Sequence, residues 1–138
     1  MPAKLDSDSI AIVKKSFGRV CRDQDFFDAF YTDFIEGNPE VKAHFKNTDL
    51  NKQKVLLKDS ITMSLLYASG SEYATKFLEN VAYIHNRQHR NIEPYLYSYW
   101  KRSFLNNLRK FDPKWDLSVE KEWNQLINLI LEFLKSKY

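Results

Sequence analysis

The chain has 138 residues, a formal net charge of +3, 3 Gly, 4 Pro and 1 Cys. This length is typical of one domain, which we expect to span residues 1–138. So few glycines and prolines argue against the many tight turns of all-β sandwiches and barrels, and they favour helices. The glycines also lie too far apart for a dinucleotide fingerprint or a phosphate-binding P-loop. Aromatic residues make up 15% of the chain, more than a small helical core normally needs.

Compartment and partner class follow from the same counts. Cys21 has no second cysteine to pair with, so no internal disulfide or multi-cysteine metal site can form, as is usual in the reducing cytoplasm. The charge is small and scattered, and the basic stretch 101–110 is interpreted as a solvated helix face rather than a nucleic-acid site. No apolar run approaches the ~20 residues of a membrane span, and the first residues lack a signal-peptide pattern. We therefore expect a cytoplasmic protein that binds neither nucleic acid nor membranes.

The first two predicted helices span residues 6–21 and about 23–36. Capping side chains at residues 6–9 open the first one, and Gly37 ends the second. Aromatic residues in the second helix recur at spacings of three and four, which predicts one buried face. These residues are Phe27, Phe30, Tyr31 and Phe34.

A short helix, a long helix and a third helix follow in the predicted order. Asn38-Pro39-Glu40 opens the short one, which runs through Phe45, because Asn caps a helix and proline suits its first turn. The long helix is expected from Leu50 to about Ala68. Gly70-Ser71 ends it and caps the third, which is expected over residues 72 to about 87.

Pro94 and the residues before it interrupt the helices once more, because the residue before a proline avoids the helical region. The last two helices are predicted over residues 95–111 and 118 to about 137, and both are amphipathic. The sequence therefore predicts an all-α fold of six to seven helices.

Three histidines are candidate metal ligands. His85 lies on the inward face of its helix, near the end, where its second ring nitrogen is expected to donate to a carbonyl of the preceding turn and set the tautomer. A core histidine without a ligand role is the ordinary alternative. His89, four residues later, has the spacing of a second ligand to one metal, but no carboxylate cluster completes a zinc site. We expect His44 on the surface.

Four segments together carry a resemblance that covers nearly the whole chain. They are Phe30-Tyr31, the stretch Asn38-Pro39-Glu40-Val41-Lys42 with Phe45, Gln53-Lys54-Val55-Leu56-Leu57, and Ile84-His85 through Pro94 and Tyr97 to Trp100. In order and spacing they resemble the globin family, especially bacterial single-domain globins and the haem domain of flavohaemoglobins. No single segment is specific, so the joint pattern carries the resemblance.

The resemblance implies a globin fold around a haem b. His85 would be the iron ligand, Phe45 would pack on the ring, and Tyr31 and Gln53 would face the bound ligand as uncharged donors. Other residues are expected to contact the haem: Leu57, Ile92, Tyr97 and Trp100 as pocket lining, and His89 at a propionate, with Arg87 or Arg90 as substitutes. Eight aromatic residues lie in the segments expected to wall the haem, so the aromatic surplus is expected to line a cofactor cavity as well as fill a core: Phe27, Phe30, Tyr31, Phe34, Phe45, Tyr97, Trp100 and Phe104.

Two departures from the family pattern leave alternatives open. The connection from Phe45 to Gln53 is short, so the distal assignment could shift by one turn. The stretch from His85 to Ile92 is slightly long, so His89 competes with His85 as the ligand. Tyr97 resembles the tyrosine that braces the histidine ligand in flavohaemoglobins, and we expect no matching glutamate from the last helix.

The resemblance implies reversible binding of dioxygen, and also of nitric oxide and carbon monoxide, for storage or delivery. Two donors in a dry pocket should slow oxygen release, so high affinity is expected. One alternative is an enzyme, a nitric oxide dioxygenase, which would need an external reductase because no reductase domain is expected after the haem domain. Others are a gas sensor and a helical bundle without haem. We expect a monomer or homodimer.

Overall fold

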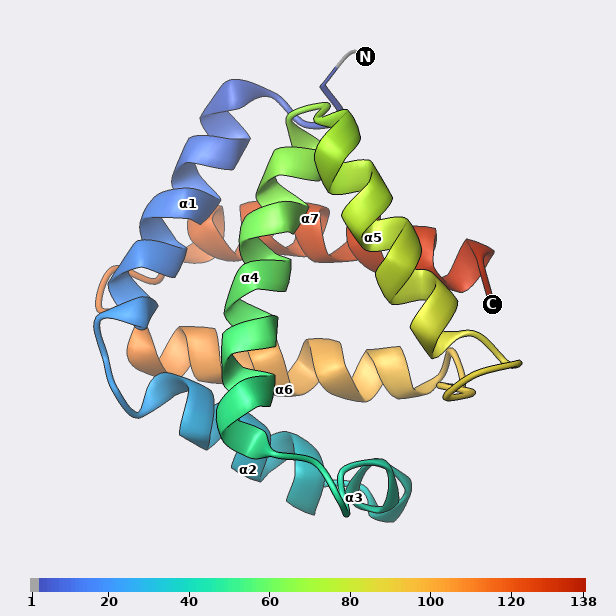
Figure 1. Ribbon diagram of the computed structural model, residues 1–138. Helices are drawn as coiled ribbons and strands as arrows, with labels where there is room; N and C mark the ends of the chain where they lie inside the picture. The colour runs from blue at the N-terminus through green and yellow to red at the C-terminus, as the bar shows by residue number, and fades with distance from the viewer. Residues whose placement is uncertain (1–2) are drawn as a thin grey trace.

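The computed structural model describes residues 3–138 as seven α-helices joined by short connections, with no strand in that range (Figure 1). The helices are α1 (Ser7–Cys21), α2 (Phe26–Glu36), α3 (Pro39–His44), α4 (Leu50–Ala68), α5 (Glu72–His85), α6 (Leu96–Phe111) and α7 (Leu117–Ser136). The predicted all-α fold is confirmed. The largest difference at a helix start is at α2, which was expected from about Asp23. No helix in the described range has the length and apolarity needed to cross a membrane.

Local chemistry explains where most of the helices begin and end. Five helices follow a side chain that accepts hydrogen bonds from backbone N–H groups of the first turn: Asp6, Asn38, Asp49, Ser71 and Asp116. Gly37 follows α2 as its C-cap, and the position favours glycine because a Cβ there would lie 2.7 Å from the backbone oxygen of Asp33. Gly70, with φ of 93°, follows α4 in a conformation that favours glycine.

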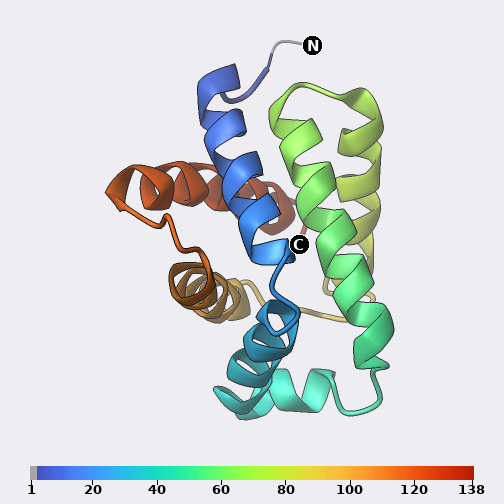
Figure 2. The same cartoon turned by 90° about the vertical axis from the view of Figure 1, so that its left-hand side faces the viewer.

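The helices form two pairs, α4 with α5 and α6 with α7, and α7 packs directly against both helices of the first pair. Figure 2 shows α4 and α5 side by side on one side of the molecule and α6 and α7 on the other, with α1 between them. Helix α2 packs on α6, and α3 connects it to the start of α4. This arrangement places the inner faces of α4 and α5 opposite those of α6 and α7.

The aromatic surplus divides between the core and the cavity described below. Phe30 and Phe104 are fully buried between α2 and α6, with ring centroids 5.4 Å apart, and Phe27 packs edge-on against Phe26 at 5.0 Å. Phe27, Phe30 and Phe104 do not line the cavity, so they belong to the core part of the surplus. The reason is that α2 buries a whole face, and only the part of that face nearest α4 reaches the cavity described below.

A buried hydrogen-bond network ties α1 to the α6–α7 connection. The carboxylate of Asp112 accepts from Ser16 Oγ at 2.6 Å and from Arg19 Nε and Nη2 at 2.6 and 2.9 Å. Burial alone would raise the pKa of Asp112, but the hydrogen bonds from Arg19 and Ser16 hold it below its usual value. Ser16 also accepts from Trp123 Nε1 at 2.8 Å, so the network orients an indole of α7.

Candidate functional site

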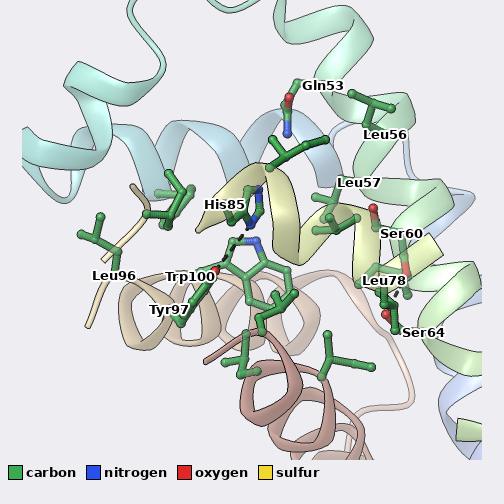
Figure 3. Close-up of a pocket in the computed structure, with 18 of the residues that line it drawn as sticks. Gln53, Leu56, Leu57, Ser60, Ser64, Leu78, His85, Leu96, Tyr97 and Trp100 are labelled. Atoms are coloured by element: carbon green, nitrogen blue, oxygen red, sulfur yellow. Dashed lines mark hydrogen bonds between the residues drawn. The ribbon is translucent and has the colours of Figure 1, made fainter. Parts of the chain in front are cut away.

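A cavity of about 410 Å³ lies between α4 and α5 and reaches the inner faces of α6 and α7 (Figure 3). Most of its lining is apolar, with Leu57 and Ile61 from α4, Val81 from α5 and Leu126 from α7. Leu56, which also lines it, is 54% exposed, so the cavity reaches the surface along α4. Apolar cavities of this size with a few polar groups are typical ligand sites.

The structure places all but one of the predicted site residues in the wall of this cavity. The lining includes Tyr31, Phe45, Gln53, Leu57, His85, Ile92, Tyr97 and Trp100. His89 does not line it: the side chain is exposed, and Nδ1 lies 2.7 Å from Oδ1 of Asn86. Helix α5 ends two residues earlier than expected, and the following loop carries His89 outward.

His85, the last residue of α5, is largely buried in the cavity. Burial lowers its pKa from 6.5 to about 4, and the nearby charges of Arg90 and His44 add to this effect. The imidazole is therefore neutral at pH 7. Its Nδ1 lies 3.5 Å from the hydroxyl of Tyr97, so the expected hydrogen bond to a carbonyl of the preceding turn is replaced by this contact. Within residues 3–138 no hydrogen bond involves Nε2, which leaves that nitrogen available as a ligand.

Tyr31 and Gln53 meet near the start of α4. The Tyr31 hydroxyl donates to the backbone carbonyl of Gln53 at 3.3 Å, and burial raises the pKa of Tyr31, so the hydroxyl stays protonated. The side chain of Gln53 points into the cavity (Figure 3). No hydrogen bond within the described part of the chain uses the Gln53 amide. Of the two predicted donors, the amide is therefore the free one.

Phe45 forms an aromatic wall with two residues of α2. Its ring centroid lies 5.9 Å from those of both Tyr31 and Phe34. Phe45 follows directly after α3, so the cap formed by Asn38 places it indirectly. This wall gives the cavity an aromatic side near the α2 and α3 helices.

Polar residues gather at one end of the cavity. His44, Thr48, Gln53 and Arg90 line both the cavity and an adjoining polar pocket, to which Lys52 also contributes. His44 is exposed, as predicted, but it also takes part in the cavity wall. Arg90 lies where His89 was expected. Lys52 and Arg90 give this end of the cavity two cationic groups, beside the carboxylate of Asp49.

Sequence reasoning missed the contribution of α7. Trp123, Leu126 and Ile127 line the cavity, although their spacing predicted only a buried helix face. An amphipathic pattern marks the inward side of a helix but does not separate close packing from a cavity wall. Ser60 and Asn80, which carry no motif, line it as well.

Clusters of conventional metal ligands do not form among residues 3–138. No three His, Cys, Asp or Glu side chains come together in a way that could hold an ion.

Comparison with solved structures finds a similar protein from Pseudomonas aeruginosa, described as structurally highly homologous to a human haemoglobin. The two share 30% sequence identity and a TM-score of 0.89, and the match covers 94% of this chain and 98% of the other. No protein-family model and no curated protein matches the sequence.

Proposed function

Because this chain belongs to the globin family, we propose that its cavity holds a haem b and that the protein reversibly binds dioxygen with high affinity. The observation that carries the proposal is the neutral, largely buried imidazole of His85, whose Nε2 has no partner in the described part of the chain. A bound haem would supply an iron that takes histidine on one side and a diatomic gas on the other.

The residues around the cavity suit a flat apolar group with acidic edge substituents. Leu57 and Ile92 offer aliphatic contact, and Phe45 offers an aromatic face. The basic side chains of His44 and Arg90 at the polar end would meet the two carboxylates. Neither basic group forms an ion pair within residues 3–138, so both are free to do so.

Each polar side chain has a distinct role in this proposal. His85 would bind the iron through Nε2, with its Nδ1 proton directed at the oxygen of Tyr97. The Gln53 amide would donate to the partly negative gas ligand, and such a bond is worth roughly 1.5–3 kcal/mol. Tyr31 would hold the first turn of α4 through the Gln53 carbonyl. The apolar lining excludes water, which strengthens these interactions.

Absorption spectra of purified protein mixed with haemin test the proposal. The wild-type protein should give a Soret band with distinct ferric, ferrous and carbon monoxide forms at one haem per chain. His85→Ala should lose the spectrum of a histidine-ligated haem, whereas His89→Ala, outside the cavity, should match the wild type. Absence of a Soret band in the wild type, or loss of ligation in His89→Ala instead, would contradict the proposal.

Nitric oxide dioxygenation is a second candidate, because the polar pocket that adjoins the cavity would favour release of an anionic product. Lys52 and Arg90 line that pocket. In this reaction nitric oxide and dioxygen give nitrate, and the haem iron loses one electron that an external reductase must return. Catalytic nitrate formation with an added electron donor would support this candidate, and a single turnover that leaves ferric protein would count against it.

A further inference from the structure

The α5–α6 loop (residues 86–95) folds back onto the end of α5. The backbone N–H groups of Arg90 and Ile92 donate to the carbonyls of Ile84 and His85 at 3.0 and 2.9 Å. Asn91 lies between them with φ of 50°, a left-handed conformation that asparagine adopts more readily than most residues. Because Arg90 and Ile92 both line the cavity, the shape of this loop sets one edge of it.

Tyr138, which follows α7, contacts this loop through both its hydroxyl and its ring. The hydroxyl donates to Oδ1 of Asn91. The guanidinium carbon of Arg87 lies 4.7 Å from the centroid of the Tyr138 ring. In Figure 1 the end of α7 lies on the same side of the molecule as the loop. A single side chain thus joins the last helix to the loop at its left-handed residue.

Tyr97 contacts His85 from α6. Its hydroxyl lies 3.5 Å from Nδ1 of His85. His85 is therefore contacted from two directions, by the Ile92 N–H at its carbonyl and by Tyr97 at its ring. The first of these contacts belongs to the loop that Tyr138 holds at Asn91.

We propose that Tyr138 is a positioning residue for His85, acting through its hydrogen bond to Asn91. With the loop held at Asn91, the Ile92 N–H stays on the His85 carbonyl, and Arg90 and Ile92 stay at the cavity edge. Without that bond only the contact between the Tyr138 ring and Arg87 ties the loop to the end of α7, and the His85 side of the cavity opens more often. The inference rests on the proposed function, because the position of His85 matters through haem retention.

Four variants test the role of Tyr138. Tyr138→Phe removes the hydroxyl but keeps the ring under Arg87, and Asn91→Gly removes the acceptor while keeping the left-handed backbone. Asn91→Asp retains an oxygen acceptor and should behave as the wild type. Tyr73→Phe, which removes a hydroxyl from a residue that is 71% exposed at the start of α5, is the matched control.

Amide hydrogen exchange of the haem-free chain is the first measurement. Exchange at Ile92 should speed up about fivefold in Tyr138→Phe and Asn91→Gly, the factor expected for one lost hydrogen bond. Exchange in α4 should not change, and Tyr73→Phe should match the wild type at both places. Unchanged exchange at Ile92 in Tyr138→Phe, or equal acceleration in Tyr73→Phe, would overturn the inference whether or not the protein takes up haemin.

Haem retention and the iron–histidine stretching frequency of the ferrous form are the second pair of readouts. Transfer of haemin to an excess of acceptor globin should be about fivefold faster in Tyr138→Phe, with a shifted stretching frequency. Asn91→Asp should give a haemin transfer rate and a stretching frequency close to those of the wild type. A wild type that binds no haemin would overturn the proposed function alone, because the exchange measurement decides the role of Tyr138 independently.

Discussion

On the α4 side of the cavity the Tyr31 hydroxyl is held by a backbone carbonyl, whereas on the α5 side the His85 ring contacts another side chain, Tyr97. The first contact is 3.3 Å long and the second 3.5 Å. A backbone carbonyl in a helix moves little, so the α4 side is fixed by secondary structure. The α5 side depends on where a loop and α6 place their residues. We therefore predict that substitutions on the α4 side change ligand affinity. The α5 side should be more sensitive to pH and to substitutions far from the cavity.

The largest effect should come from pH acting on His85. Its pKa is about 4 in the folded protein and 6.5 without burial, so between these values the unfolded chain binds a proton that the folded chain does not. The free energy of unfolding of the haem-free protein should therefore fall by about 2–3 kcal/mol as pH drops from 6.5 to 4. Urea unfolding across this window measures it.

His85→Ala should remove this part of the pH dependence, whereas His89→Ala should keep it because His89 is exposed. A wild-type curve that stays flat between pH 6.5 and 4 would show that the imidazole is not buried in its neutral form.

On the α4 side, Gln53→Leu should raise the oxygen dissociation rate of the haem-loaded protein about tenfold or more. The reason is loss of a hydrogen bond to a partly charged ligand, worth roughly 1.5–3 kcal/mol. Stopped-flow displacement of oxygen by carbon monoxide measures the rate. A rate equal to that of the wild type would remove Gln53 from the ligand site and would favour an assignment shifted by one turn.

Tyr31→Phe should have a smaller effect on oxygen release, about fivefold or less, because the Tyr31 hydroxyl already donates to the backbone carbonyl of Gln53. It should also lower the free energy of unfolding of the haem-free protein by about 1 kcal/mol. The same stopped-flow and urea experiments measure both. If Tyr31→Phe speeds oxygen release more than Gln53→Leu does, the hydroxyl turns toward the ligand when the cavity is filled.

The smallest effect is expected for Tyr97→Phe. A contact of 3.5 Å is at the long limit of hydrogen bonding, so haemin loss should change less than about threefold. Transfer of haemin to an acceptor globin checks this value. A larger change would show that the contact shortens when His85 binds iron, and the contrast between the two sides of the cavity would then be weaker.

Local chemistry made much of the fold predictable. The Gly70-Ser71 pair marked the end of the long helix α4, which was expected from Leu50 to about Ala68 and is observed over these residues. Apolar spacing also pointed His85 inward. Such features depend on residues within one or two turns of each other, so a sequence carries them directly.

The site was less predictable where loops and close packing decide the outcome. His89 and Arg90 are adjacent in the sequence, but only Arg90 lines the cavity, because of the hydrogen bonds that fold the α5–α6 loop. Phe30 and Tyr31 are adjacent as well, yet Phe30 is core and Tyr31 is cavity wall. Helix periodicity shows which residues face inward. It does not show which of two adjacent inward residues is closely packed and which lines a cavity.

The sequence by itself determined an all-α chain with a candidate ligand at His85 and candidate donors at Tyr31 and Gln53. Only the tertiary structure decided that Tyr31 donates to the Gln53 carbonyl, and that Tyr138 reaches Asn91 across 47 residues of chain. Helices and caps form through short-range hydrogen bonds. These pairings instead depend on how whole helices pack, and small changes in the angle between two helices would separate them.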